Sequence, residues 1–178
     1  MQDSVTMAQA KPNRIRTQRL ELKTIPREDA PKVVGILTHE EVGKTYMVPQ
    51  NPTEEVKKRL SESFCRLSAA DDRFVYGIYR EDILVGLMND VEIRDGAIEL
   101  GYAFHPENWN QGYATEALQA AIDTLHRMGY HTVRTGAFPE NLASIRVMEK
   151  AGMTRLIETE DVEYRGEIHR CVLFEKKA

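Results

Sequence analysis

A stretch near the middle of the chain places a predicted strand, a short glycine-containing loop and a predicted helix in direct succession. Residues 97–104 are rich in apolar and aromatic side chains, and Pro106 ends the strand because proline cannot donate a ladder hydrogen bond. From Ala114 onward, apolar residues recur at three- and four-residue spacing, which predicts an amphipathic helix that Gly129 ends. The chain must therefore pass from a sheet strand into a helix at this loop.

The loop between these two elements predicts an anion-binding site. The first backbone N–H groups of a helix lack internal partners, and the helix dipole adds partial positive charge there, so such an end binds phosphate. Gly112 has no side chain and Ala114 a minimal one, so an anionic ligand can approach the amides of residues 110–115. The chain has no GxxxxGK(S/T) motif and lacks the glycines of a dinucleotide fingerprint. The loop thus predicts a phosphate cradle of unidentified ligand, and an ordinary helix start without a ligand is the alternative.

Residues 109–114, around the same loop, resemble the acyl-CoA pyrophosphate loop of the GNAT N-acetyltransferases, which has the pattern Q/R-x-x-G-x-G/A. Residues 99–102 before the loop, and residues 141–144 and 149–153 after it, are similar to the RimJ/RimL-type branch of that family, whose members acetylate ribosomal-protein N-termini. That branch also begins with a segment like residues 17–22. The resemblance therefore covers nearly the whole chain.

The resemblance implies that acetyl-CoA is the co-substrate and that the loop holds its pyrophosphate, with Trp109 at a position where the family usually has Gln or Arg. It also implies that the pantetheine arm lies between two splayed parallel strands. There the strand end would offer it backbone groups. The residues expected to bind the cofactor are Phe104, His105, Asn110, Gln111, Gly112, Tyr113, Ala114, Thr115, Asn141 and Ser144.

The apolar pattern predicts a single α+β domain over residues 14–178, preceded by a flexible tail at residues 1–13. The strand–helix–strand unit of residues 97–137 requires a right-handed crossover, so its two strands are parallel within a mostly antiparallel, twisted sheet. This is the mixed-sheet, GNAT-like fold that the resemblance also implies. Seven strands are expected, at residues 19–25, 73–80, 83–93, 97–104, 131–137, 153–160 and 168–174, with about four helices, at residues 28–38, 53–68, 114–127 and 141–151.

The composition favours a soluble globular protein and argues against several classes of partner. A net charge of −4 gives no reason to expect nucleic-acid binding, and no apolar run is long enough for a signal peptide or a membrane span. Two cysteines far apart in sequence, and five histidines without ligand spacing, predict neither a disulfide framework nor a metal site. We expect a cytoplasmic enzyme, a monomer or homodimer, whose partners are acetyl-CoA and an amine acceptor.

Glu99 is the candidate general base for the reaction that the resemblance implies, which is direct attack of a neutral amine on the thioester through a tetrahedral intermediate. It interrupts an apolar strand that leads to the cofactor, and a partly buried carboxylate has a raised pKa that suits proton acceptance, directly or through a water. Two alternatives stay open. Either Glu99 faces outward from the sheet, or a one-residue shift in register places Ile98 at the catalytic position.

Ser144 is the candidate proton donor to the departing thiolate, because Asn141 and Ser144 resemble the NxxS pair that the RimJ/RimL-type branch places beside the sulfur. The tyrosine that has this role in many other GNAT enzymes would fall at Met148, which cannot donate a proton. The alternative is structural, with Asn141 as a helix N-cap and Ser144 as a polar residue of the first turn. For Asn141 the two interpretations are compatible.

The acceptor is expected to be the N-terminal amine of a protein or peptide. The alternatives are a small amine, such as an antibiotic or polyamine, or a non-catalytic CoA-binding sensor. The acceptor pocket is expected between the predicted helices at residues 28–38 and 53–68 and the turn near Arg165. Acidic residues within 40–41 and 160–163 predict the attraction of a cationic chain end to this region.

Overall fold

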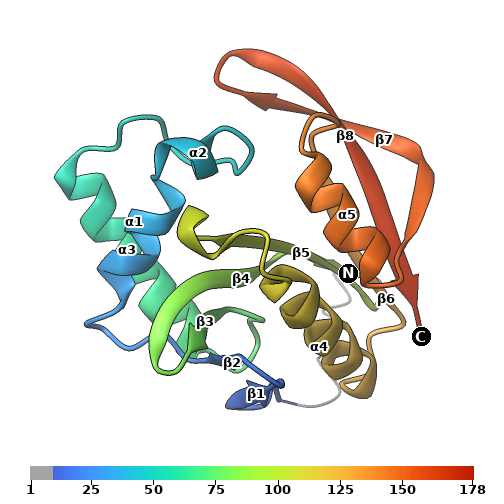
Figure 1. Cartoon of the computed structure of the whole chain (residues 1–178), viewed down its shortest axis with the longest axis horizontal. Helices are drawn as coiled ribbons and strands as arrows, with labels where there is room; N and C mark the ends of the chain where they lie inside the picture. Colours follow the sequence, from blue (N-terminus) through green and yellow to red (C-terminus); the bar gives the residue numbers. More distant parts are fainter. Residues whose placement is uncertain (1–9) are drawn as a thin grey trace, which may run out of the picture.

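The chain forms an eight-stranded mixed sheet with helices on both faces (Figure 1), as seen in a computed structural model that describes residues 10–178. The strands are β1 (Arg14–Arg16), β2 (Glu21–Lys23), β3 (Tyr76–Arg80), β4 (Ile83–Arg94), β5 (Ala97–Phe104), β6 (Thr132–Ala137), β7 (Thr154–Tyr164) and β8 (Glu167–Lys177). The helices are α1 (Ala30–Leu37), α2 (Glu40–Gly43), α3 (Glu54–Ala69), α4 (Tyr113–Arg127) and α5 (Leu142–Lys150), with a 3-10 turn, η1 (Pro106–Asn108). The sequence-based prediction of an α+β fold with a mixed sheet is confirmed.

The strands lie in the order β1-β2-β3-β4-β5-β6-β8-β7, and within residues 10–178 only β5 and β6 pair in parallel. Helix α4 makes the crossover between them, as the sequence predicted. Their pairing covers only residues 97–99 of β5 and 132–134 of β6. Beyond Glu99 the two strands diverge, so the predicted splay is present and opens toward the start of α4.

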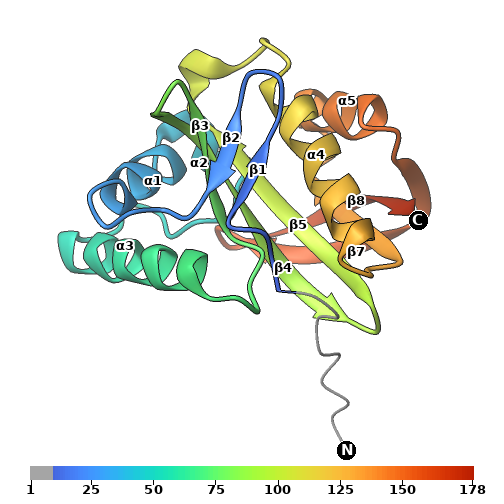
Figure 2. The ribbon, with the colours of Figure 1, turned by 90° about the horizontal axis from the view of Figure 1, so that it is seen from below.

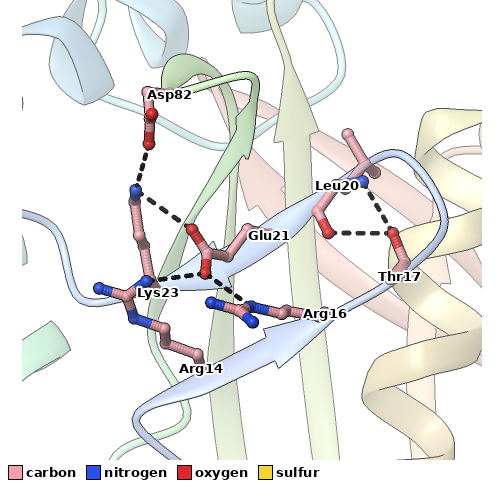
Figure 3. Close-up of polar contacts among 7 residues, drawn as sticks. All are labelled: Arg14, Arg16, Thr17, Leu20, Glu21, Lys23 and Asp82. Carbon is pink, nitrogen blue, oxygen red and sulfur yellow. Dashed lines mark hydrogen bonds and ion pairs between the residues drawn. The ribbon is translucent and has the colours of Figure 1, made fainter.

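The structure corrects the predicted count of seven strands and about four helices, because it adds β1 and α2. Both elements are shorter than the window over which periodicity is informative. Strand β1 contributes one buried apolar side chain, Ile15. On its exposed side Glu21 of β2 accepts hydrogen bonds from Arg14 and Arg16 and pairs with Lys23 (Figure 3). In β1, ionic contacts to the neighbouring strand thus accompany a single apolar anchor.

The predicted flexible tail, residues 1–13, falls mostly on residues 1–9, which lie outside the described residues. At its end the Lys11 side chain is buried. Its ammonium donates to the carbonyls of Ser68 at 2.6 Å and Val75 at 3.2 Å, and lies over the ring of Tyr76. Ordered contacts with the domain therefore begin before Arg14.

The two larger apolar clusters occupy the two faces of the sheet, beneath the helices that Figure 2 shows on either side of it. The larger cluster packs α4 and Met148 of α5 against the strands, and Leu118, Ala121 and Leu125 of α4 are fully buried in it. The smaller cluster packs α1 and α3 on the opposite face. Neither α4 nor any other helix within residues 10–178 combines the length and apolar character needed to cross a bilayer.

The predicted hairpin turns are confirmed, and each has the positive φ angles that tight two-residue turns require. Asp95 and Gly96, between β4 and β5, have φ of 51° and 73°. Arg165 and Gly166, between β7 and β8, have φ of 54° and 78°. Gly96 and Gly166 adopt this conformation readily, whereas Arg165 does so at a steric cost.

Candidate active site

A cavity of about 500 Å³ lies where β5 and β6 diverge; we call it the β5–β6 cavity. Both strand ends contribute to its walls, and the starts of α4 and α5 close its sides. It holds eight of the ten predicted cofactor-binding residues, and His105 and Gln111 are the two outside it. Those eight residues are Phe104, Asn110, Gly112, Tyr113, Ala114, Thr115, Asn141 and Ser144.

The start of α4 presents unpartnered amides to this cavity. Gly112 is the N-cap with φ of 81°, and it offers no side chain to cap the helix. Glu116 is the first residue whose amide bonds within the helix, to the Gly112 carbonyl at 3.1 Å. The amides of residues 113–115 come before it and have no acceptor in the described part of the chain. This cradle fits the pyrophosphate of a CoA thioester, which needs donors and positive potential rather than a side-chain anion.

Contacts between the β1–β2 turn and α4 hold the cradle in place. The Glu116 carboxylate accepts hydrogen bonds from the Thr17 hydroxyl at 2.6 Å and from the Arg19 amide at 2.7 Å, and it pairs with the Arg19 guanidinium at 2.7 Å. Burial opposes ionisation of Glu116, but these hydrogen bonds outweigh it and hold the pKa of the carboxyl below its ordinary value. Arg19 also donates to the backbone carbonyl of Gln111 at 2.9 Å, and the Gln111 side chain donates to the Glu107 carbonyl at 3.1 Å and does not line the cavity.

The residues between β5 and α4 differ from the expected arrangement in one respect. The Trp109 indole N–H donates to the Phe104 carbonyl at 2.8 Å, and the His105 amide donates to the Val85 carbonyl at 2.9 Å. One backbone group of each residue expected to face the pantetheine arm therefore has a partner inside the protein. The His105 ring caps η1 by accepting from the Glu107 amide at 3.3 Å.

Two hydroxyl groups meet across the β5–β6 cavity, those of Tyr102 and Ser144, with the oxygens 2.9 Å apart. Asn141 accepts a hydrogen bond from the Ser144 amide at 3.2 Å, so Asn141 is the N-cap of α5, in agreement with the structural alternative for this residue. Burial raises the pKa of Tyr102 to about 12, and the hydrogen bond with Ser144 opposes this shift. Tyr102 therefore keeps its proton at neutral pH.

Tyr102 was not among the residues predicted from the sequence, although it lies in the segment 99–102 that carried the resemblance. Its partner Ser144 is 42 residues away, so the pair is visible only in the fold. Met148, at the position where many GNAT enzymes have tyrosine, is fully buried in the core. In many GNAT enzymes the hydroxyl comes from a tyrosine at the position of Met148. Here the hydroxyl beside Ser144 comes instead from Tyr102 of β5.

Glu99 is the last residue of β5 that pairs with β6, where it lies opposite Arg134. It does not line the β5–β6 cavity. Burial raises the pKa of the Glu99 carboxyl, and the nearby carboxylates of Glu160 and Glu92 raise it further while Arg134 opposes them. The alternative was that a one-residue shift in register places Ile98 at the catalytic position. Ile98 is fully buried in the main core, and its apolar side chain cannot act as a base.

A second cavity of about 650 Å³ lies beyond α2; we call it the α2 cavity. The end of α1, helix α2, the loop to α3 and the β7–β8 turn surround it, in the region expected to receive the acceptor. The Tyr164 hydroxyl donates to the Gly43 carbonyl at 2.6 Å, with the Tyr46 carbonyl 3.2 Å away, and so joins the hairpin to the α2 segment. The residues that line the α2 cavity are Thr38, His39, Glu40, Gly43, Lys44, Val48, Pro49, Gln50, Asn51, Pro52, Lys57 and Arg165.

Metal-binding side chains do not gather anywhere in residues 10–178: no three His, Cys, Asp or Glu residues are grouped so as to hold an ion.

Sequence comparisons identify relatives with the same kind of domain. The family described as the acetyltransferase (GNAT) domain matches residues 19–154. The probable N-acetyltransferase YjcK of Bacillus subtilis (strain 168) is 33% identical over 105 residues, which are 56% of this chain and 58% of that protein. The uncharacterized N-acetyltransferase YnaD of the same strain is 35% identical over 86 residues, 47% of this chain and 51% of that protein. These matches span little more than half the length of either relative.

Solved structures share the fold over nearly the whole chain. A GNAT-family acetyltransferase from Bacillus anthracis superposes with a TM-score of 0.78 at 25% identity, covering 92% of this chain and 98% of that one. A structure titled RimL, ribosomal L7/L12 alpha-N-protein acetyltransferase, superposes with a TM-score of 0.79 at 18% identity, covering 93% and 94%. At the latter identity the likeness concerns the fold alone.

Proposed function

The chain belongs to the GNAT family of acetyltransferases, and on that basis we propose that it transfers the acetyl group of acetyl-CoA to the N-terminal amine of a protein or peptide in the cytoplasm. The observation that carries this proposal is the β5–β6 cavity. There, unpartnered amides at the start of α4 and a hydroxyl pair at Tyr102 and Ser144 line one continuous space. The two cysteines among the described residues, Cys65 and Cys171, are both free thiols, in keeping with a reducing compartment.

Each part of the cavity has a proposed task in the transfer. When bound, acetyl-CoA supplies an activated thioester. The amides of residues 113–115 hold its phosphates, and this orientation contributes several kcal/mol toward the barrier. As the amine nitrogen bonds to the acetyl carbon and the carbon–sulfur bond breaks, the Ser144 hydroxyl gives a proton to the sulfur. The Tyr102 hydroxyl replaces the proton on Ser144, and water returns a proton to Tyr102, which balances the proton that the amine loses.

The proton that the amine must lose goes to Glu99 through water in this proposal, because Glu99 lies next to the divergence of the strands but outside the cavity. Its raised pKa favours proton acceptance near neutral pH. Because this carboxylate lies outside the cavity, it is poorly placed to deprotonate an amine of high pKa. The site therefore favours an acceptor amine of low pKa.

An N-terminal amine suits such a site better than a lysine side chain. At pH 7, an α-amino group with a pKa near 8 needs about 1.4 kcal/mol to become neutral, whereas lysine with a pKa near 10.4 needs about 4.6 kcal/mol. Solved neighbours of the same fold include proteins titled ribosomal-protein acetyltransferases, one of them for L7/L12. Those titles motivate protein N-termini as the first acceptors to test.

The test is thiol release from acetyl-CoA with three sets of acceptors. One set has peptides with a free N-terminus, one has the same peptides blocked at the N-terminus but carrying lysine, and one has polyamines and aminoglycosides. We expect the first set to react fastest. Equal rates for the two peptide sets, or reaction only with the small amines, would reject the N-terminal proposal. Binding of CoA by calorimetry without thiol release from any set would instead identify a non-catalytic CoA-binding protein.

A further inference from the structure

Three basic side chains line the α2 cavity, although the whole chain carries a net charge of −4. Lys44, Lys57 and Arg165 line it, and Glu40 is the acidic residue among the lining residues. The acidic residues that were expected to attract a cationic chain end lie elsewhere, except for Glu40. Glu41 is paired with Lys44 at 2.6 Å, and residues 160–163 do not line the cavity. Lys57 is likewise paired with Glu54, so Arg165 is the basic lining residue left to bind an anionic group, which differs from that expectation.

Arg165 is the cation best placed to bind such a group. It occupies the β7–β8 turn with φ of 54°, a conformation that side chains rarely adopt and that glycine or asparagine would adopt more easily. Its guanidinium lies over the Tyr164 ring, 5.0 Å from the centroid. Within residues 10–178 it forms no ion pair, whereas Lys44 and Lys57 each pair with a neighbouring glutamate. Its charge is thus available to a ligand.

Gly43 leaves room for this guanidinium. A Cβ atom at position 43 would lie 2.9 Å from Arg165 Nη2, so any larger residue there would displace the guanidinium from its place. Gly43 is in α2 and does not have a positive φ, so its backbone conformation does not require glycine. Two unusual choices, arginine in a turn and glycine in a helix, therefore produce one result, a guanidinium held at the edge of the cavity.

The same segment of chain separates the two cavities. Val42, Thr45 and Tyr46 line the β5–β6 cavity, whereas Gly43, Lys44 and Val48 line the α2 cavity. The two cavities therefore lie on either side of one short segment of chain.

We propose that the α2 cavity binds an acidic side chain of the acceptor peptide, close after its N-terminal residue, with Arg165 as the principal contact. This inference rests on the proposed function, since it assumes a peptide acceptor. The guanidinium geometry matches a carboxylate through two parallel N–H···O bonds, which a lysine cannot provide.

The test compares peptides that share a first residue and differ at one position, with Asp against Asn and Glu against Gln, placed in turn at the second, third and fourth positions. We expect kcat/KM of the parent protein to be about tenfold higher for the acidic peptide at one of these positions, as one charge-assisted hydrogen bond contributes. Arg165→Gly should abolish that preference without straining the turn, because glycine accepts positive φ. Arg165→Glu should reverse it in favour of a lysine at the same position.

Arg170→Gln is the matched control, because Arg170 is an exposed arginine of the same hairpin that pairs with Asp161 and lines neither cavity. It should keep the acidic preference. Equal kcat/KM for acidic and amide peptides in the parent protein would overturn the inference while leaving N-terminal acetylation intact. If no peptide is acetylated, calorimetric titration with the acidic and amide peptides decides the matter. Tighter binding of the acidic peptide that Arg165→Gly removes supports the site, and equal binding rejects it.

Discussion

The hydroxyls of Tyr102 and Ser144 are the groups of the β5–β6 cavity best suited to deliver a proton to a leaving sulfur. Because the pKa of Tyr102 is raised to about 12, the phenol stays protonated at every pH at which the enzyme would work. Ser144 alone is a poor acid, and a proton that it gives away must be replaced. The 2.9 Å contact provides that replacement from a side chain on the facing strand.

Tyr102→Phe should therefore lower kcat by about 100-fold, at the low end of the range for general acid catalysis, and leave the affinity for acetyl-CoA unchanged. Ser144→Ala should have a similar effect, and the double variant should lose little more than either single variant because the two hydroxyls act together. Tyr130→Phe is the control, since it removes a buried hydroxyl without a hydrogen-bond partner that lies outside the cavity. Fully additive losses would argue against a shared proton path.

Glu99→Gln should raise stability at neutral pH. Burial and the neighbouring Glu160 and Glu92 raise the folded-state pKa of Glu99, so the folded protein holds this proton more tightly than the unfolded chain does. That contribution is complete below the unfolded-state pKa and is lost as pH rises through the folded-state pKa. The variant should have the higher urea midpoint near pH 7, and the two proteins should converge near pH 4.

The same substitution tests the role of Glu99 in catalysis. A base must be ionised, so the raised pKa should place the acidic limb of the parent's kcat/KM profile above the ordinary glutamate range. Glu99→Gln should lower kcat and remove this limb. An unchanged profile would leave the stability effect standing and assign deprotonation of the amine to solvent.

Sequence reasoning found the residues that act within one local motif and missed those that depend on a distant partner. Asn141 and Ser144 are three residues apart, and their capping bond is a local property of a helix start. Glu116 contacts Thr17 across 99 residues and Arg19 across 97 residues. The segments on both sides of this contact were recognised separately, but no pattern in the sequence joins them.

At the scale of the element, the start of α4 makes a sharp prediction about its N-cap. Gly112→Ala forces a side chain into positive φ and places a methyl group 3.2 Å from Arg19 Nη2, beside the proposed phosphate cradle. Gly152→Ala, at the end of α5, has nearly the same φ of 77° and a contact of 3.3 Å to Lys176, but it lies outside the cavity. Both variants should lose about 1–2 kcal/mol of stability from the backbone conformation.

Only Gly112→Ala should also weaken the binding of CoA, by about tenfold or more in calorimetry, because a displaced amide costs a charge-assisted hydrogen bond to phosphate. Equal affinities of the two variants for CoA would show that the phosphates bind elsewhere.

Long elements such as α4 and β5 could be predicted because their periodicity extends over several turns or alternations. Strand β1 has three residues and α2 has four, so neither provides a pattern to recognise.

At the scale of the whole molecule, the β7–β8 hairpin near the C-terminus contacts the α2 segment near the N-terminus. It extends from the sheet toward α2 (Figure 1), and the Tyr164 hydroxyl bonds to the Gly43 carbonyl across 121 residues. The sequence predicted both the hairpin and its turn, but not this contact, because a hairpin's tilt depends on the twist and divergence of the strands beside it. The contact fixes the segment that forms the wall between the two cavities.

Tyr164→Phe should therefore separate acceptor binding from cofactor binding. The phenyl ring can still pack against Phe138, but the hydrogen bonds of the hydroxyl to the Gly43 and Tyr46 carbonyls are lost. The amide hydrogens of residues 43–48 should therefore exchange faster with solvent. We expect the KM for peptide acceptors to rise several-fold and the stability to fall by about 1 kcal/mol, with the affinity for acetyl-CoA unchanged. The cofactor should be insensitive because its proposed cradle is held from the other end of the molecule, by Thr17 and Arg19 on Glu116. A parallel loss of acetyl-CoA affinity, or unaltered exchange at residues 43–48, would mean that the hairpin does not position this wall.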